Sequence, residues 1–236
     1  MKKYLTILVV AAGALLILCG CPISGWNDIG VSPGWIESYY SIKNNFKNSK
    51  IKVDDGKLSV TIFAGSFYAS ASGYIYNGEQ KYYELCEKYG DLKPGGFLLR
   101  QYVEPTGLVT ARYMGDYAVE TAIAELITGI EITTEYPWDA DHPQGSSLND
   151  IFDVEYVTFY PFVQSGWILD DPKTHVHKPL EDLCAGDLKL LSSDGIVLST
   201  SVMPPSGERC QLTVKLLFDT GVPSTYMLGK IIDAGY

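Results

Sequence analysis

Residues 54–64 read DDGKLSVTIFA, and this stretch decides the class of fold. Asp54-Asp55-Gly56 is typical of a tight hairpin turn, and the residues after it alternate between apolar and polar. Because side chains of a strand point alternately to its two faces, this period predicts a strand that buries Leu58, Val60 and Ile62 on one face.

Similar short segments, each bounded by Gly, Pro, Asn or Asp, recur along most of the chain. They lie at 66–76, 97–104, 108–114, 130–135, 152–160, 187–191, 195–202, 209–218 and 225–232. The 17 tyrosines and 8 phenylalanines also favour pleated sheets, on whose surfaces aromatic residues pack well. The chain is therefore expected to be mainly β, as an antiparallel β-sandwich that is immunoglobulin-like or open and barrel-like.

One or two short helices are expected beside these strands. The best candidate runs over 116–127, where Asp116 can cap the start, Gly129 can end the helix, and apolar residues recur at helical spacing. A single helical turn is predicted at 179–186, and residues 35–46 suit either a strand or a short helix.

The N-terminus has the anatomy of a secretory signal. Two lysines precede an apolar run over 5–18, which is too short to cross a membrane as a helix and ends at Leu18-Cys19-Gly20-Cys21. This junction resembles the lipobox of bacterial lipoproteins. The resemblance implies that residues 1–20 are removed and that Cys21 becomes a lipidated N-terminus, which would anchor the protein in a membrane without a spanning segment.

The same resemblance sets the expected organisation and location. Residues 21–48 are expected to be the lipid anchor and a tether, and residues 49–236 a β-rich globular domain. Pro22 stands where an aspartate would, by analogy, retain a lipoprotein at the inner membrane, so the outer membrane is favoured, on either face. Without the signal, 16 basic residues face 28 acidic ones, and the net charge changes from −10 to −12. Such a protein is repelled by phosphate backbones, which argues against nucleic acid as a partner.

Three further stretches resemble a group of uncharacterised envelope lipoproteins from Bacteroidetes-type bacteria. They are Ile130–Thr133 (IEIT), Asp139–Pro143 (DADHP) and Gly145–Asp150 (GSSLND). That group carries no known activity, so the resemblance implies a location and a fold but no chemistry.

The loop at 139–150 is the first candidate metal site. Asp139, Asp141 and Asp150 are spaced like the first, third and last ligands of a calcium loop, but Pro143 and Gln144 replace a ligand and the glycine that such a loop requires. The alternative is a solvated loop in which the aspartates form Asx turns. We therefore expect no cofactor, with calcium at this loop as the alternative.

His175 and His177 are the second candidate. On a strand they would face the same side and could begin a zinc site, although nearby spacing fixes no third ligand; the alternative is a polar loop. Cys86, Cys184 and Cys210 form no CxxC motif and no Cys/His cluster, and among three thiols at most one disulfide can form.

Trp138 and Trp167, like Trp26 and Trp35, lie near expected turns, where an aromatic ring can stack on a sugar or a partner surface. The alternative is that these rings pack into the ends of the sandwich. The sequence contains no GxSxG, P-loop or GxGxxG motif.

These features predict a non-catalytic, lipid-anchored envelope protein that binds a carbohydrate or an envelope protein partner through its loops. The alternative is an envelope hydrolase with a dispersed site, which would need Asp139, Asp141, His142, His175 or His177 to converge in one cleft. A structural component that assembles through a sheet edge is the third interpretation.

Overall fold

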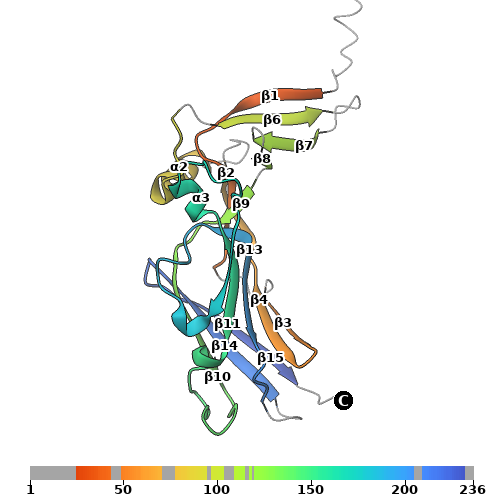
Figure 1. Cartoon of the computed structure of the whole chain (residues 1–236), viewed down its shortest axis with the longest axis vertical. Coiled ribbons are helices and arrows are strands. Elements are labelled where there is room, and N and C mark those ends of the chain that lie inside the picture. The colour runs from red at the N-terminus through yellow and green to blue at the C-terminus, as the bar shows by residue number, and fades with distance from the viewer. Residues whose placement is uncertain are drawn as a thin grey trace, which may run out of the picture. The chain divides into compact units, whose positions relative to one another are not determined.

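The structure, a computed structural model, describes residues 25–43, 49–70, 78–94, 97–103, 109–114, 117–118, 120–204 and 209–231 (Figure 1). The chain divides into two compact units. The smaller contains residues up to Ser32 together with Phe97–Val119, and the larger contains Pro33–Gly96 and Glu120–Tyr236. Most elements are strands, accompanied by two α-helices in the described residues, so the predicted mainly β class is confirmed.

The smaller unit is a four-stranded antiparallel sheet. Its strands follow the order β1 (Gly25–Ser32), β6 (Phe97–Val103), β7 (Val109–Met114) and β8 (Tyr117–Ala118). Strands β6 and β7 match the segments expected at 97–104 and 108–114, whereas β1 lies in the segment expected to be a tether. Its partner strand β6 lies far along the chain, so the polar, turn-rich sequence of β1 gave no local sign of the pairing.

The larger unit contains an eight-stranded sheet. Six strands follow the order β12 (Thr174–Pro179), β11 (Asp153–Thr158), β13 (Leu191–Thr200), β9 (Glu120–Ile123), β2 (Ile36–Ser41) and β5 (Ser66–Ser70), while β4 (Lys57–Ile62) pairs with β13 and with β3 (Ser49–Asp54). All these pairs are antiparallel except β2 with β9. The two aspartates and the glycine before β4 form the predicted hairpin turn between β3 and β4.

Strand β13 changes partner along its length. Ser192 pairs with Ala122 of β9, whereas residues 196–200 pair with β4. Gly195 lies between these two regions with φ +92°, and a Cβ atom added there would lie 1.9 Å from the carbonyl oxygen of Ile62. Only glycine can adopt this backbone conformation and lie so close to the Ile62 carbonyl group. Gly195 is therefore required at the point where β13 changes from pairing with β9 to pairing with β4.

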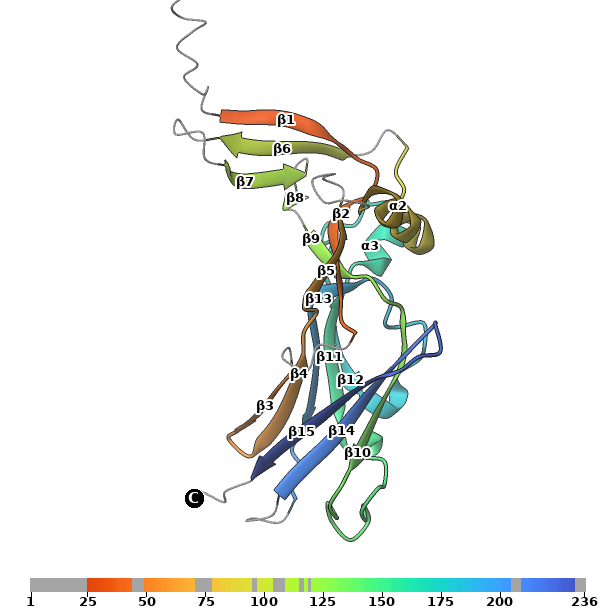
Figure 2. The same ribbon diagram turned by 180° about the vertical axis from the view of Figure 1, so that it is seen from behind.

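A second sheet of the larger unit contains β10 (Ile127–Thr134), β14 (Arg209–Phe218) and β15 (Ser224–Ile231), and Figure 2 shows it running obliquely to β11 and β13. Apolar residues of both sheets pack in one core, which makes this unit a sandwich. On β4, Leu58, Val60 and Ile62 are fully buried while their neighbours are not, as the alternation in the sequence predicted.

The core of the larger unit also contains residues from the segment expected to be a tether. Trp35, Ile36, Tyr39 and Ile42 are buried, and β2 pairs with two other strands. Two strands of the described residues, β1 and β2, therefore lie within the segment expected to be a tether. Turn residues at 22–34 obscured these strands, because they suit both a tether and the connection between two strands.

The two α-helices found among the described residues are α2 (Gly78–Tyr89) and α3 (Tyr160–Gln164), which lie side by side in Figure 1. The helix expected at 116–127 is wrong, since β9 and the start of β10 occupy that region. Residues 122–124 are consecutively buried, so their apolar character reflects a strand covered on both faces rather than one face of a helix.

Two smaller expectations have different outcomes. The helical turn predicted at 179–186 is present as a 3-10 helix at Leu180–Asp182, whereas the strand predicted at 187–191 is a turn that leads into β13. In the part of the chain that the structure describes, no helix has both the length and the apolar character needed to cross a membrane.

Candidate functional site

The loop at 139–150 is organised around His142. Asp139 Oδ1 accepts hydrogen bonds from the backbone N–H groups of Asp141 (2.9 Å) and His142 (2.8 Å), which is an Asx turn. The His142 ring lies between two carboxylates, with Nδ1 2.7 Å from Asp139 Oδ1 and Nε2 3.1 Å from Asp150 Oδ2. Two of the three predicted calcium ligands, Asp139 and Asp150, therefore contact the same imidazole ring.

This arrangement changes the protonation of the loop. Hydrogen bonds to Asp150 and Asp139 raise the pKa of His142 above its ordinary value. Burial alone would raise the pKa of Asp139, but hydrogen bonds from the side chain and backbone of His142 and from the backbone of Asp141 lower it. The two carboxylates therefore favour the protonated form of the imidazole.

His175 and His177 lie on β12 with both side chains exposed on the same face, as the period of a strand predicted. His177 Nε2 is 3.6 Å from Asp153 Oδ2 on the neighbouring strand. No hydrogen bond or ion pair between described residues joins these histidines to the 139–150 loop. A search of those residues finds no group of three or more His, Cys, Asp or Glu side chains that could hold a metal ion.

Trp138 and Trp167 are both less accessible than expected. Trp138 is 1% exposed, packs beside Phe152 and donates from Nε1 to the carbonyl oxygen of Val202 at 3.0 Å, so it belongs to the core and cannot stack on a ligand. Trp167 is half-buried and donates from Nε1 to Asp91 Oδ1 at 2.9 Å. Packing and a hydrogen bond hold the ring of Trp138, whereas the half-buried ring of Trp167 is held by the hydrogen bond to Asp91.

Asp91 is a buried carboxylate beside α2. Its Oδ2 accepts the backbone N–H of Ile36 at 2.9 Å, and the backbone N–H of Trp35 also donates to it. Burial raises the pKa of Asp91 to about 6, although these bonds and the one from Trp167 act to lower it. The carboxylate therefore joins the end of α2 to the start of β2 and to the segment after α3.

The cysteines make no disulfide among the described side chains. Cys86 is buried on α2 and Cys184 is exposed, both as free thiols, and the side chain of Cys210 lies outside the described residues. Burial raises the pKa of Cys86 to about 12, so its thiol is protonated at neutral pH. Trp26 likewise has no described side chain.

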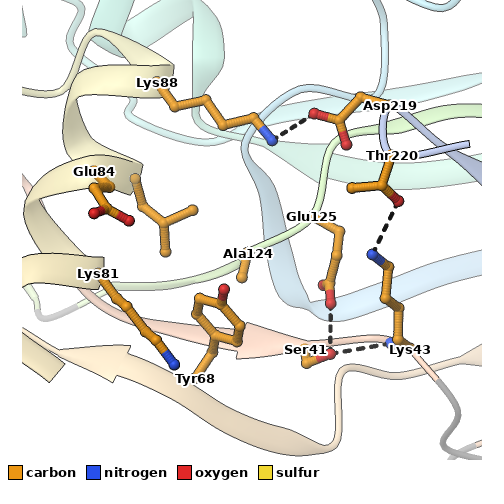
Figure 3. Close-up of a pocket in the computed structure, with 11 residues that line it drawn as sticks. Ser41, Lys43, Tyr68, Lys81, Glu84, Lys88, Ala124, Glu125, Asp219 and Thr220 are labelled. Carbon is orange, nitrogen blue, oxygen red and sulfur yellow. Dashed lines mark hydrogen bonds and ion pairs between the residues drawn. The ribbon is translucent and has the colours of Figure 1, made fainter. Parts of the chain in front are cut away.

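A cavity that the sequence did not predict lies in the larger unit, with a volume of about 390 Å³ (Figure 3). It is formed by α2, the end of β2, β5, the segment after β9 and the turn after β14. Its lining residues are Ser41, Lys43, Tyr68, Lys81, Glu84, Leu85, Lys88, Ala124, Glu125, Asp219 and Thr220. Most of them are charged or can form hydrogen bonds, so the cavity suits a polar ligand.

The helix forms one wall of this cavity. Lys81, Glu84 and Lys88 project from α2, and Figure 3 places Thr220 and Asp219 on the opposite side. Lys88 Nζ lies 2.8 Å from Asp219 Oδ2 and joins the two walls.

Glu125 is the best-fixed carboxylate of the cavity. Its Oε1 accepts the hydroxyl of Ser41 at 2.5 Å, and its Oε2 accepts the backbone N–H of Ile42 at 3.1 Å. These two bonds hold the end of β2 against the segment after β9. The walls of the cavity are thus connected by side chains as well as by the sheet.

Tyr68 supplies an accessible ring. Its side chain lines the cavity and is 42% exposed, and Lys81 Nζ lies 5.4 Å from the ring centroid. One relevant sign is present in the sequence, namely the helical spacing of Lys81, Glu84, Leu85 and Lys88. That spacing has meaning only once α2 is known, and Tyr68 was expected merely to be one residue of a strand.

A comparison of the chain with protein-family models, with curated proteins and with solved structures finds no match. The geometry of the cavity is therefore the basis for its chemistry. That geometry combines an accessible aromatic face with hydrogen-bond donors and acceptors on opposite walls, which is an arrangement for binding.

Proposed function

We propose that this protein is a lipid-anchored envelope protein that binds a carbohydrate, without catalysis, in the cavity beside α2. The observation that carries the proposal is the ring of Tyr68, 42% exposed on the wall of a cavity of about 390 Å³ among carboxylates, hydroxyls and ammonium groups. A sugar has an apolar ring face and a rim of hydroxyl groups, so it needs both an aromatic surface and mixed donors and acceptors.

The size and polarity of the cavity favour a carbohydrate over a protein partner. Small-molecule sites occupy about 300–1,000 Å³, and this cavity falls at the lower end of that range. Its lining is more polar than that of most small-molecule sites, which suits a ligand rich in hydroxyl groups. A protein partner would instead need an interface of about 800 Å² on each side.

Support for the lipid anchor comes from the N-terminal sequence. The lipobox resemblance ends at Cys21, and β1 begins at Gly25, so residues 22–24 alone separate the acceptor cysteine from the first strand. Two acyl chains would hold the protein durably at a membrane surface. Pro22 after the cysteine supports the outer membrane as the location, and the cavity would then meet envelope polysaccharides.

The binding proposal is tested with the full-length protein, purified in detergent and applied to an array of saccharides. Binding of the best saccharide is then measured by calorimetry for the wild type, Tyr68→Ala and Tyr83→Ala. Tyr83 is the matched control, because it is 44% exposed and does not line the cavity. We expect Tyr68→Ala to weaken binding about tenfold and Tyr83→Ala to leave it unchanged. No binding on the array, or equal loss in both variants, would overturn the proposal.

The anchor is tested by labelling cells with radioactive palmitate. Cys21→Ser should remove both the label and the membrane association. Cys19→Ser is the control, because serine is small and leaves the acceptor in place. A labelled Cys21→Ser protein, or an unlabelled wild type, would contradict lipid anchoring.

A further inference from the structure

The turn after α3 presents apolar side chains to solvent. It comprises residues 165–169, with the sequence Ser-Gly-Trp-Ile-Leu, and we name it the apolar turn. Ile168 is 80% exposed, the highest fraction among the large apolar side chains of the described residues, and Leu169 is 41% exposed. Single exposed apolar residues are normal on a protein surface, whereas adjacent ones indicate contact with a partner.

The backbone of the apolar turn adopts a conformation that is unfavourable for its sequence. Gly166 has φ +75° and Trp167 has φ +62°, and the second value lies in the left-handed region that a bulky residue rarely adopts. The Trp167 ring compensates by donating from Nε1 to Oδ1 of the buried Asp91 at 2.9 Å. Such strain persists only where the surrounding structure fixes it, and it concentrates at binding sites. The fold therefore maintains the exposure of Ile168 and Leu169.

The first backbone N–H groups of the turn already have acceptors. Those of residues 166, 167 and 168 donate to acceptors within residues 162–165, at 3.1, 3.0 and 3.3 Å. An N–H group without an acceptor is costly in a lipid environment, where water cannot replace the lost bond. The apolar turn can therefore enter the surface of a bilayer without leaving these three donors unpaired.

The turn is also bonded to the part of the larger unit that comes first after the proposed anchor. The N–H groups of Trp35 and Ile36, at the start of this unit, donate to the same Asp91 carboxylate as Trp167 does. Residues 22–34 alone separate Trp35 from Cys21, and this stretch spans at most about 50 Å when it is fully extended. A bilayer that holds acyl chains on Cys21 is therefore within reach of the turn.

From these observations, and resting on the lipid anchor proposed for Cys21, we infer that the apolar turn is a second membrane contact, which inserts Ile168 and Leu169 into the surface of the anchoring bilayer. A few apolar side chains suffice for such a contact, because the acyl chains already hold the protein at a high local concentration near the lipid. A protein partner would need about 800 Å² of interface, to which one short turn contributes little. A lipid surface therefore fits the turn better than a protein partner does.

The residues that follow the turn determine the kind of lipid. Asp170 and Asp171 come directly after Leu169, and both are exposed. The next basic residue along the chain, Lys173, forms an ion pair with Glu120 at 2.8 Å, so these four side chains together have a negative charge. An anionic membrane surface repels such a segment. The turn should therefore favour lipids without net charge, such as phosphatidylcholine.

The experiment measures contact between the turn and lipid directly. The full-length lipidated protein is reconstituted in phosphatidylcholine vesicles whose acyl chains are brominated near the headgroup, because bromine quenches tryptophan fluorescence on contact. Ile168→Trp adds a reporter in the turn. Met227→Trp is the matched control, since Met227 is also an exposed apolar residue, at 64%, but lies on β15 of the other sheet. The fluorescence of the wild type, which has four tryptophans of its own, is subtracted from that of each variant.

We expect the fluorescence added by Ile168→Trp to fall by about half or more in brominated compared with ordinary vesicles, because side chains inserted about 5–10 Å below the surface meet the brominated chains. The fluorescence added by Met227→Trp should fall by about a tenth or less. Replacing part of the phosphatidylcholine with phosphatidylglycerol, which is anionic, should reduce the quenching in Ile168→Trp, and added salt should restore it.

The other outcomes separate the turn from the anchor. If the wild type floats with the vesicles but neither variant is quenched, the anchor stands and insertion of the turn is overturned in favour of a protein partner. Equal quenching in the two variants would also reject the turn as a specific contact. Stronger quenching in the presence of phosphatidylglycerol would contradict the preference for neutral lipid. A wild type that does not float with the vesicles would overturn the anchor, and with it this inference.

Discussion

Replacing Asp91 with asparagine is expected to change how the stability of the larger unit depends on pH. The carboxyl group is fully buried, and burial raises its pKa to about 6 in the folded state, against 3.8 for an ordinary aspartate. Between these pH values the folded state keeps a proton that the unfolded state has lost. The free energy of unfolding that Asp91 contributes is therefore fully present below pH 3.8 and is lost as the pH rises through about 6.

The magnitude follows from the two pKa values. At about 1.4 kcal/mol for each pH unit, the difference between about 6 and 3.8 amounts to about 3 kcal/mol. Asparagine does not titrate, so the variant lacks this dependence. From about pH 3.5 to about pH 7.5, the stability of the wild type relative to Asp91→Asn should therefore fall by about 3 kcal/mol.

The assay is urea unfolding of the full-length protein in detergent, followed by far-UV circular dichroism at a series of pH values. Asp187→Asn is the control, because the pKa of Asp187 is shifted in the opposite direction and its contribution to stability should change with pH in the opposite sense. Lys178 and the backbone N–H of Cys184 lower the pKa of Asp187, so its contribution is present at neutral pH and is lost as the pH falls. Parallel stability curves for the wild type and Asp91→Asn would refute the account of Asp91 as a buried, proton-binding carboxylate.

Three further changes test other parts of the structure. Gly195→Ala should destabilise the protein by about 3 kcal/mol or more, because its Cβ would lie 1.9 Å from a backbone oxygen. The control is Gly145→Ala, which has φ +82° but no atom within 4 Å and should lower the stability by only about 1–2 kcal/mol. Chemical unfolding compares the two variants. His142→Gln should destabilise the protein at acidic pH and have little effect well above the raised pKa of His142, since its stabilising charge is lost as the pH rises; equal destabilisation at all pH values would contradict the ion pairs. Trp138→Ala should lower the stability by about 3–5 kcal/mol, as expected for a buried ring, and should leave saccharide binding by the remaining folded protein unchanged in calorimetry.

The strands that the sequence revealed are those in which burial alternates. Strand β4 buries Leu58, Val60 and Ile62 and begins after a tight turn, so its local sequence contained the whole signal. Strand β1 was not predicted, because its local sequence does not alternate clearly and its pairing partner, β6, lies far along the chain. Strand β9 was mistaken for a helix, since burial of both faces removes the alternation that identifies a strand.

The cavity could not be predicted because it depends on α2. Among its described side chains this helix buries Tyr82, Leu85, Cys86 and Tyr89 and no others, so its sequence does not stand out among the strands. Without the helix, nothing in the sequence brings its charged face to the turn at 219–220, which lies more than a hundred residues away. The loop at 139–150, in contrast, was found from local spacing, and the structure places the ring of His142 between two of its three aspartates.

The most direct test of the account is hydrogen–deuterium exchange of the full-length protein with and without the tightest saccharide from the array. Binding in the cavity predicts slower amide exchange in α2, in the segment after β9 and in the turn at 219–221, with no change in the 139–150 loop. Protection of that loop, with α2 unaffected, would place the ligand elsewhere and contradict the central claim.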